Sequence, residues 1–428
     1  MTRNELLRYI FWEWIEPIGS ALGIALLVMK FVMALYVIPT GSMQPTLHGK
    51  GDYPSELGDK VLVNKFIYRF EKPKRWDVIV FEFPYRTIVC NNCQQDVVRE
   101  VPNDAPNEIP ERAECFQMSC RGKSKNLSFI RKDYIKRCVA VPGDEVSVRD
   151  GSIVLKEDGV WKHSVKTDLA QDAMWVPVFD SEKEEQMGML NYYWKSNADL
   201  SKWQSSSVLE LSGETEQSLL FYDKENLRGH GDKGPNGGPL PLRPFVGDVQ
   251  LSLELNQVPA KGKLDLEISW NHVPHILELD FTAKTLNIKL PDQSILNTTL
   301  PKFSELSFAR VDGHIWLELD DVIQKFPIKG LNPSEITKTI MPKLRYKGEK
   351  LRIDRLEVKR DIFYQGGNYE HFTGQDQSYK VMSGSYFAMG DNSYHSYDGR
   401  MWGPVPEEQL IGKALTVILP FSRIKLIY

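Results

Sequence analysis

A serine and a lysine in this sequence are of the types that form a nucleophile and its base. Ser42 lies in segment 39–47, Pro-Thr-Gly-Ser-Met-Gln-Pro-Thr-Leu, where two prolines and a glycine constrain the turn. Serines are common in turns, so this segment taken alone fits an ordinary polar turn as well as a catalytic one. A serine hydroxyl attacks a carbonyl only when a nearby base takes its proton. The catalytic interpretation therefore requires a base elsewhere in the chain.

Lys136 is the candidate base. It lies in segment 133–144, where a strand would place Tyr134, Lys136, Cys138 and Ala140 on one face. Because this face is largely apolar, a lysine on it loses hydration, and its pKa falls from about 10.4 toward neutrality, as a general base requires. A lone lysine more often reaches solvent at a sheet edge. Only the accompanying serine segment favours the catalytic interpretation.

A third segment, 390–406, combines glycines, short polar side chains and a tryptophan, a composition that suggests the wall of a site. Asp398 and Arg400 are spaced to form an ion pair that fixes this loop. His395 lies in the same loop and is the alternative base. A lone histidine in a polar loop is more often a bystander, so Lys136 is the stronger candidate.

A long apolar segment directly precedes the serine turn. Between residues 17 and 38 the only formal charge is Lys30, and the span is long enough to cross a bilayer as a helix. A buried core helix is one alternative. A cleaved signal peptide is another, but acidic residues precede the segment and no small-x-small site closes it. We expect an N-terminal segment over residues 1–14 and an uncleaved transmembrane anchor over residues 15–38. Basic residues on both sides leave its orientation open.

The rest of the chain reads as a mainly β protein. Its 428 residues exceed the usual size of one domain, and 42% of them are hydrophobic, as in globular proteins. We expect a β domain from residues 39–150 and 380–428, interrupted by inserted regions 151–245 and 246–360. In the last range short runs alternate apolar and polar residues, and an Asp-Gly pair marks a hairpin turn. This pattern is typical of a β-sandwich and resembles concanavalin-like modules.

Four cysteines lie in an inserted loop, residues 88–125. The spacing of Cys90, Cys93, Cys115 and Cys120 resembles a zinc ribbon. Two disulfides are an alternative if the loop is outside the cytoplasm, and two reduced pairs without a role are a third. The fifth cysteine, Cys138, is interpreted as a small core residue beside the candidate base.

The three segments, together with Gly58-Asp59 and residues 76–81, resemble the sequence boxes of bacterial type I signal peptidases, the leader peptidases. They occur in the order of that family and follow an apolar anchor. Three motifs in the same order are a far stronger signal than any one of them. The resemblance implies a catalytic domain of coiled antiparallel sheets.

The resemblance also implies a role for each matching residue. Ser42 matches the acylated nucleophile and Lys136 the base that takes its proton. Thr40 falls where a hydroxyl donates to the oxyanion beside the Ser42 N–H, and Ser396 falls where a serine orients the lysine amine. The remaining matches are structural supports: Asp391, Asp398 and Arg400. The implied activity is that of a membrane-bound serine endopeptidase that removes signal peptides from exported preproteins after small-x-small sites, with no cofactor for catalysis.

The same resemblance predicts partners and location. The partners are preprotein signal peptides, the lipid bilayer and the secretion machinery. The protein would be a single-pass protein of the bacterial inner membrane, with its catalytic domain on the extracytoplasmic side. The formal net charge of -4 gives no reason to expect nucleic acid as a partner.

Two other functions compete with this one. A self-cleaving repressor-type protease shares a Ser-Lys dyad, but it needs a DNA-binding domain where this chain has an apolar segment. A catalytically inactive, membrane-anchored protein could use the sandwich for binding. Ser42, Lys136, Thr40 and Ser396 are all present, which argues against loss of activity.

Overall fold

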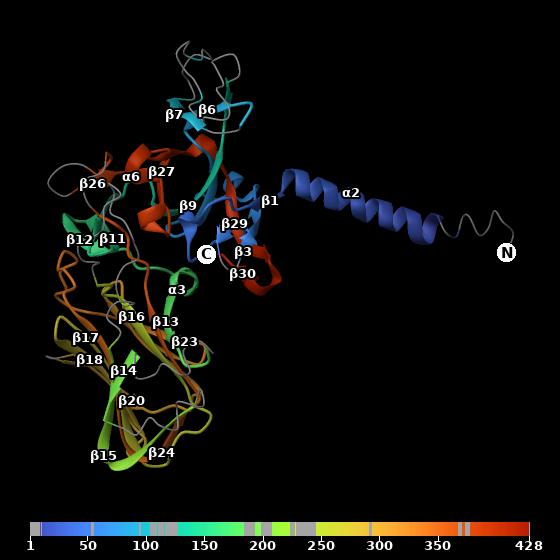
Figure 1. The fold of residues 1–428 in the computed structure, drawn as a ribbon. Helices are drawn as coiled ribbons and strands as arrows, with labels where there is room; N and C mark the ends of the chain where they lie inside the picture. The colour runs from blue at the N-terminus through green and yellow to red at the C-terminus, as the bar shows by residue number, and fades with distance from the viewer. Residues whose placement is uncertain are drawn as a thin grey trace.

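Strands predominate in the computed structural model, in agreement with the predicted mainly β class. It describes residues 9 and 11–427 apart from 53–54, 94–95, 103–108, 110–114, 116–126, 184–192, 198–207, 223–226, 228–244, 291–292, 367–369 and 373–376. Figure 1 shows a sheet-rich upper part, a two-layered lower part and a helix, α2, that extends away from both.

The upper part is built on an eight-stranded antiparallel sheet with the order β1-β4-β29-β5-β9-β27-β28, in which β30 also pairs with β29. Its strands are β1 (Met33–Val37), β4 (Lys60–Asn64), β5 (Val78–Glu82), β9 (Asp133–Ala140), β27 (Ser385–Met389), β28 (Val405–Pro406), β29 (Leu410–Leu419) and β30 (Lys425–Leu426). Strand β29, from the end of the chain, therefore lies between two strands from its beginning.

Strand β5 shows why this sheet is buried on both faces. Val78 and Val80 pack into one apolar cluster, and Ile79 and Phe81 pack into another on the opposite face. A strand covered on both sides needs a continuous apolar run rather than an alternating one. The sequence Val-Ile-Val-Phe meets this requirement.

Three smaller sheets accompany the large one. The strands β2 (Lys50–Asp52) and β3 (Ser55–Leu57) form a hairpin, and β6 (Tyr85–Cys90) pairs with both β7 (Asp96–Pro102) and β8 (Leu127–Ile130). The third has the order β12-β11-β10-β26, formed by β10 (Glu145–Arg149), β11 (Ser152–Glu157), β12 (Val160–His163) and β26 (Ser378–Lys380).

Within the described part of the chain, helices are few and mostly short. The α-helices are α2 (Glu16–Phe31), α3 (Asp168–Met174) and α6 (Gly399–Trp402), and a π-helical turn, η1 (Phe11–Ile15), precedes α2. The 3₁₀ turns are η2 (Gly41–Met43), η3 (Ile67–Arg69), η6 (Ser393–His395), η7 (Glu407–Gln409) and η8 (Phe421–Arg423).

The lower part is a sandwich of two antiparallel sheets that share one large apolar core. The six-stranded sheet contains β13 (Val176–Asp180), β25 (Arg355–Arg360), β16 (Val249–Glu254), β21 (Glu305–Val311), β22 (His314–Leu319) and β23 (Val322–Pro327), in that order. The seven-stranded sheet contains β14 (Trp194–Ser196), β15 (Leu209–Phe221), β24 (Ile340–Ile353), β17 (Gly262–Trp270), β18 (Val273–Asp280), β19 (Thr285–Leu290) and β20 (Gln293–Thr299). The Asp312-Gly313 pair joins β21 to β22 with positive φ at both residues, as a two-residue hairpin turn requires.

The sandwich begins earlier in the chain than the predicted range 246–360. Strand β13 pairs with β25, and β15 pairs with β24, so the strands of the range 151–245 from β13 onward belong to the sandwich, whereas β11 and β12 belong to the sheet of β10. The alternation of apolar and polar residues along the chain does not predict which distant strands pair with each other. The chain enters the sandwich at Val176 and leaves it at Arg360, and these two residues are direct partners across β13 and β25. The Gly/Pro-rich stretch 229–244 lies outside the described residues.

The predicted membrane helix over residues 15–38 also needs correction. Helix α2 ends at Phe31, and Met33–Val37 forms strand β1, which pairs with β4. Met-Ala-Leu-Tyr-Val has the aromatic and β-branched character that favours a strand when a partner edge is available. Within the described residues, no helix combines the length and the hydropathy expected of a membrane span.

These pairings predict the result of deleting residues 246–360. That deletion removes β24 and β25 but leaves β13 and β15 with uncovered apolar faces, so the product should be insoluble. Deletion of 177–359, with Val176 joined to Arg360 by a short flexible linker, removes both sheets entirely and closes a gap between residues that already face each other. Soluble yield and thermal melting of both deletions test this. Equal solubility of the two products would contradict it.

Candidate active site

Ser42 lies in the short turn η2, and the 390–406 loop holds this turn in place. The serine is buried, with 8% of its surface exposed. The Asn392 backbone N–H donates to Ser42 O at 3.1 Å, and its side-chain amide donates to Gly41 O at 3.0 Å. Sequence reasoning assigned Asn392 no function. The structure gives it a positioning contact with the candidate nucleophile.

Lys136 reaches the serine from the middle of the large sheet. Strand β9 lies between β5 and β27, and Lys136 sits opposite Ile79. Lys136 Nζ lies 2.7 Å from Ser42 Oγ and also donates to the carbonyl oxygen of Ile135 at 3.1 Å. The lysine is only 3% exposed. The two residues are 94 positions apart in the chain and in direct contact in the fold.

Burial lowers the pKa of Lys136 to about 8, because an ammonium inside the protein loses its hydration. The carboxylates of Asp398 and Asp391 act in the opposite direction, and Arg400 adds to the lowering. A lysine with this pKa exists partly as the neutral amine near neutral pH, which is the form that accepts a proton.

The lysine lies on the apolar face that the alternation predicts. Cys138 is fully buried in the same cluster as Ile79 and Phe81, and the Tyr134 ring packs against that cluster. Lys136 Nζ is 5.6 Å from the centre of the Tyr134 ring. Cys138 is therefore a core residue of the strand that carries the lysine.

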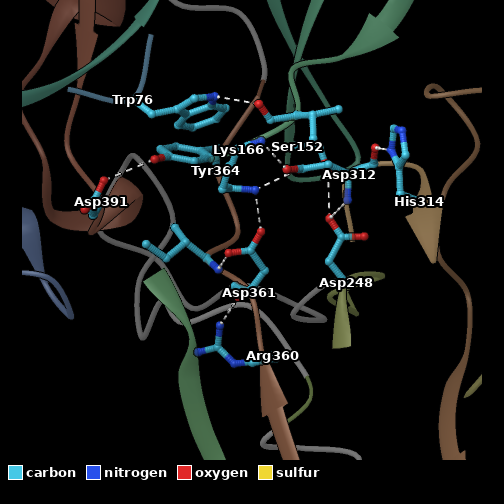
Figure 2. Close-up of polar contacts among 12 residues, drawn as sticks. Trp76, Ser152, Lys166, Asp248, Asp312, His314, Arg360, Asp361, Tyr364 and Asp391 are labelled. Carbon is cyan, nitrogen blue, oxygen red and sulfur yellow. Dashed lines mark hydrogen bonds and ion pairs between the residues drawn. The ribbon is translucent and has the colours of Figure 1, made fainter. Parts of the chain in front are cut away.

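The opposite face of β9 carries a second buried cation, Arg137, that sequence reasoning missed. Its guanidinium donates to both carboxylate oxygens of Asp391, at 2.8 and 2.7 Å, and both side chains are inaccessible to solvent. Asp391 also accepts from the hydroxyls of Thr46 and Tyr364; Figure 2 shows the Tyr364 contact. Arg137 further donates to the Trp76 carbonyl at 2.8 Å. A buried arginine on a central strand requires a carboxylate partner. This requirement is what could have indicated, from the sequence, that Arg137 forms an ion pair.

A second buried ion pair fixes the loop of the third segment. Arg400 Nε and an Nη group donate to the two oxygens of Asp398, each at 2.9 Å. Arg400 also donates to the Ser393 hydroxyl at 2.8 Å, and Asp398 accepts from the Gly390 N–H at 2.9 Å. Burial alone would raise the pKa of Asp398, but Arg400 and the hydrogen bonds hold it below its ordinary value. Asp398 therefore stays ionised and keeps the loop closed.

Ser396 comes close to the dyad through Gly390. A Cβ atom on Gly390 would lie 2.1 Å from Ser396 Oγ and 2.5 Å from the Ser42 carbonyl oxygen, so only glycine fits between them. Ser396 is buried, and its hydroxyl makes no well-formed hydrogen bond within the described part of the chain, although it lies near enough to Asp398 to help lower that pKa. Its predicted contact with Lys136 is not formed in this structure.

Thr40 precedes the serine turn in extended conformation, with φ -135° and ψ 155°, and its side chain is exposed and makes no capping hydrogen bond. Its backbone is confined by Gly49, where an added Cβ would lie 2.3 Å from the Thr40 carbonyl carbon.

His395, the alternative base, is exposed on η6, and its backbone N–H donates to the Asn392 carbonyl oxygen. The buried lysine, and not this histidine, contacts the serine.

Three of the four loop cysteines gather in one cluster. The sulfur atoms of Cys90, Cys93 and Cys115 all lie within 4.8 Å of one another, and Cys93 and Cys115 are 3.4 Å apart. Cys120 lies outside the described residues. None of the described cysteines forms a disulfide. The cluster sits beside the buried Ile88 and Leu127, in the small core of the β6–β8 sheet.

The buried Lys136 should cost the folded protein stability, and Lys136→Met should recover it. Unfolded, the amine keeps its proton up to the ordinary pKa of 10.5, whereas the folded protein releases it above about pH 8. The variant should therefore be more stable by about 3 kcal/mol below pH 8. The gain should shrink between pH 8 and 10.5 and then vanish. Chemical denaturation from pH 6 to 11 measures this, and a gain that grows with pH would contradict it.

Part of this chain is similar in sequence to known signal peptidases. Probable signal peptidase I of Mycobacterium leprae (strain TN) is 32% identical over 154 residues, which cover 33% of this chain and 44% of that protein. Signal peptidase I of Aquifex aeolicus (strain VF5) is 39% identical over 159 residues, 34% of this chain and 58% of that protein. The chain thus spans about half the length of these relatives.

The sandwich has weaker likenesses. The crystal structure of the Emp46p carbohydrate recognition domain in its potassium-bound form aligns with 43% of this chain and 97% of its own, at 10% identity and a TM-score of 0.28. A TM-score this low supports no argument about the sandwich.

One family profile matches two separate ranges of the chain. The family described as signal peptidase, peptidase S26, matches residues 11–208 and 342–419, which together make up more than half of the chain. The described residues of the intervening range, 209–341, belong to the sandwich. Ser42, Lys136 and the 390–406 loop all lie within the matched ranges. The chain is a member of the S26 signal peptidase family.

Proposed function

We propose that this protein is a signal peptidase I that hydrolyses peptide bonds through an acyl-enzyme on Ser42, with Lys136 as the general base. The observation that carries this proposal is the 2.7 Å separation of Lys136 Nζ and Ser42 Oγ inside a buried site. The lowered pKa of Lys136, about 8, supports it because a base must be neutral to accept a proton. No cofactor is needed for this chemistry.

The reaction follows from these positions. Neutral Lys136 takes the proton of Ser42, and the serine oxygen attacks the carbonyl carbon of the scissile bond. The resulting oxyanion accepts hydrogen bonds from the Ser42 N–H and from the exposed Thr40 hydroxyl. Lys136 then gives its proton to the leaving amine. In the second half of the reaction it activates a water molecule, which releases the acyl group from Ser42.

Ser396, Asp391, Asp398 and Arg400 support this chemistry without touching the substrate. We assign Ser396 the orientation of the lysine amine once substrate excludes water, since its hydroxyl lies across Gly390 from the Ser42 backbone. The buried Asp398–Arg400 and Arg137–Asp391 pairs hold the surrounding loops.

The proposed substrates are exported preproteins with a small-x-small motif at the end of a signal peptide. The segment before the serine fits this substrate. From Phe11 to Gly23 every side chain of η1 and α2 is exposed, including Trp12, Trp14, Ile18 and Leu22. A run of exposed apolar side chains on an isolated helix suits contact with lipid. We therefore propose attachment to the bacterial inner membrane through this segment, with the catalytic domain outside the cytoplasm and beside the secretion machinery.

An inactive binding protein is a weaker candidate. Among the described side chains no carboxylate forms an ion pair with Lys136. Its burial therefore lowers the stability of the fold, and no ion pair offsets this cost. A protein that no longer used the dyad would have no reason to keep it.

We further propose that Cys90, Cys93, Cys115 and Cys120 hold a structural zinc ion. Tetrahedral Zn–S bonds of about 2.3 Å place sulfur atoms about 3.8 Å apart, and the three described sulfur atoms lie within 4.8 Å of one another. Such an ion would tie the ends of the 88–125 loop to the β6–β8 sheet. It would stabilise the loop and take no part in peptide hydrolysis.

Removal of either member of the dyad should abolish cleavage. Ser42→Ala and Lys136→Ala should each leave a folded protein without preprotein cleavage, and Lys136→Arg should also fail because a guanidinium does not release its proton. His395→Ala should retain activity and serves as the control. Cleavage of a preprotein by purified enzyme in detergent is the measurement. Substantial turnover by folded Lys136→Ala would overturn the assignment.

The Thr40 hydroxyl should matter for rate more than for binding. Thr40→Val keeps the shape of the side chain but loses the donor, so kcat should fall by about 10²–10³ while KM changes little. Thr40→Ser restores the donor and should be nearly normal. If kcat of Thr40→Val equals that of the wild type, the second oxyanion donor is a different group.

The cysteine cluster should bind one zinc ion per chain, measurable by elemental analysis of purified protein. Cys90→Ser should lose the metal and lower the melting temperature, because zinc binding is coupled to the folding of such loops. Cys138→Ser, at the buried cysteine outside the cluster, should keep the metal. Mass spectrometry that finds two linked cysteine pairs and no metal would establish disulfides instead.

A further inference from the structure

The orientation of one peptide plane decides how well the Ser42 N–H can stabilise the oxyanion of the proposed reaction, because that N–H must point at the developing charge. A peptide unit is planar and trans, so its C=O and its N–H point in opposite directions. The unit that carries the Ser42 N–H is the one that carries Gly41 O. Any group that holds Gly41 O in place therefore also aims the Ser42 N–H.

Two hydrogen bonds hold Gly41 O. The Gln44 backbone N–H donates to it at 3.1 Å within the turn η2, and the Asn392 side-chain amide donates to it at 3.0 Å from the 390–406 loop. A carbonyl oxygen only accepts, so the group that Asn392 presents to it is an amide N–H. The bond from Gln44 lies inside the turn, whereas the bond from Asn392 fixes the peptide plane relative to the rest of the site.

The glycine at position 41 makes this outside bond important. A residue without a Cβ atom opposes rotation of the adjoining peptide planes less than other residues do. The turn η2 is only three residues long, so few bonds within it resist such a rotation. If the plane rotates, the Ser42 N–H turns away from the substrate, although Ser42 Oγ can stay in contact with Lys136.

Asn392 also holds the peptide plane on the other side of the serine. Its backbone N–H donates to Ser42 O at 3.1 Å. The next residue, Met43, is fully buried and packs in an apolar cluster with Val61 and Val78. Asn392 therefore binds both peptide units that flank the Cα atom of Ser42, one with its side chain and the other with its backbone.

Asn392 is itself firmly placed. It follows Asp391, whose carboxylate is bound by the buried Arg137, and its own carbonyl oxygen accepts from the His395 N–H at 3.0 Å. Arg137 is the neighbour of Lys136 on β9. The peptide planes of the serine are therefore fixed relative to the strand that carries the candidate base.

We propose that Asn392 is a positioning residue for the oxyanion: its side-chain amide, through Gly41 O, aims the Ser42 N–H at the negative charge that develops on the substrate. This inference rests on the proposed function, because it assigns a residue to the transition state of that reaction. Asn392 acts through the peptide plane and does not itself touch the reacting atoms. Its side chain therefore governs the rate of the chemical step, and it governs neither substrate binding nor the base.

The test uses two variants, Asn392→Ala and Asn392→Leu, in the full-length enzyme in detergent. Both remove the side-chain donor without adding a charge, and both keep the backbone N–H that binds Ser42 O. Loss of a whole oxyanion donor lowers kcat by about 10²–10³-fold, so a donor that is present but misaimed should lower it by about 10–100-fold, with KM changed by less than about twofold. His395→Ala, at an exposed residue of the same loop, is the control and should keep the wild-type kcat.

Two further measurements separate this role from a general loosening of the site. The kcat/KM for preprotein should rise with pH through the pKa of Lys136, about 8, and both variants should keep this midpoint because the base is unchanged. A peptide aldehyde forms a hemiacetal with Ser42 whose oxygen occupies the oxyanion position, so its inhibition constant should rise by the factor by which kcat falls. The corresponding peptide alcohol has no carbonyl group and should bind all the enzymes equally.

Several results would overturn the proposal. One is a kcat within about twofold of the wild type in both variants. Another is a fall in kcat that comes with a raised KM, a shifted pH midpoint or loss of folding in thermal melts, because these indicate a purely structural role. In either case the peptidase activity of the wild type stands. If wild-type enzyme cleaves no preprotein at all, the proposed function itself fails.

Discussion

One buried carboxylate, Asp391, joins the segments that carry the candidate site. It binds Arg137 on the strand of the lysine, Thr46 just after the serine turn, and Tyr364 where the chain returns from the sandwich. A charge in this position is tolerated only because each of its lone pairs meets a donor. Removal of one partner from such a buried pair typically costs about 3–5 kcal/mol. The geometry of Ser42 and Lys136 depends on a pair that takes no part in their chemistry.

Neighbouring cations on one strand show how the fold separates structure from chemistry. Arg137, next to Lys136 on β9, is neutralised by the bidentate carboxylate of Asp391, in the way that Arg400 on α6 is neutralised by Asp398. Lys136 is buried to a similar degree, but its amine contacts a serine hydroxyl and no carboxylate. Burial therefore destabilises its protonated form and lowers its pKa. Of these two neighbours, Lys136 is the one whose pKa is lowered, which fits its proposed role as general base.

The sequence was informative where chemistry or short-range patterns decide the outcome. The alternation in 133–140 placed Lys136 and Cys138 on one buried face, and the Asp-Gly pair located a hairpin. It was uninformative where distant segments decide. Met33–Val37 looks like the end of an apolar helix until β4 offers it an edge, and Leu209–Phe221 has no obvious role until β24 pairs with it. Arg137 acquires its role only from Asp391, 254 positions along the chain, and Tyr364 acquires its role from the same carboxylate where the chain returns from the sandwich.

The position of β29 has a consequence for the order in which the candidate site forms. This strand fills the gap between β4 and β5, although nearly the whole chain separates it from them. Its Ala414 and Val417 also pack in the same cluster as Met43 and Leu47, the residues that seat the serine turn. Until β29 pairs with β4 and β5, the facing edges of these two strands stay unpaired. The turn that carries Ser42 then also lacks part of the apolar cluster against which Met43 and Leu47 pack. Such long-range pairing is slow and exposes the chain to aggregation, but it also delays assembly of the proposed proteolytic centre until the surrounding fold is complete.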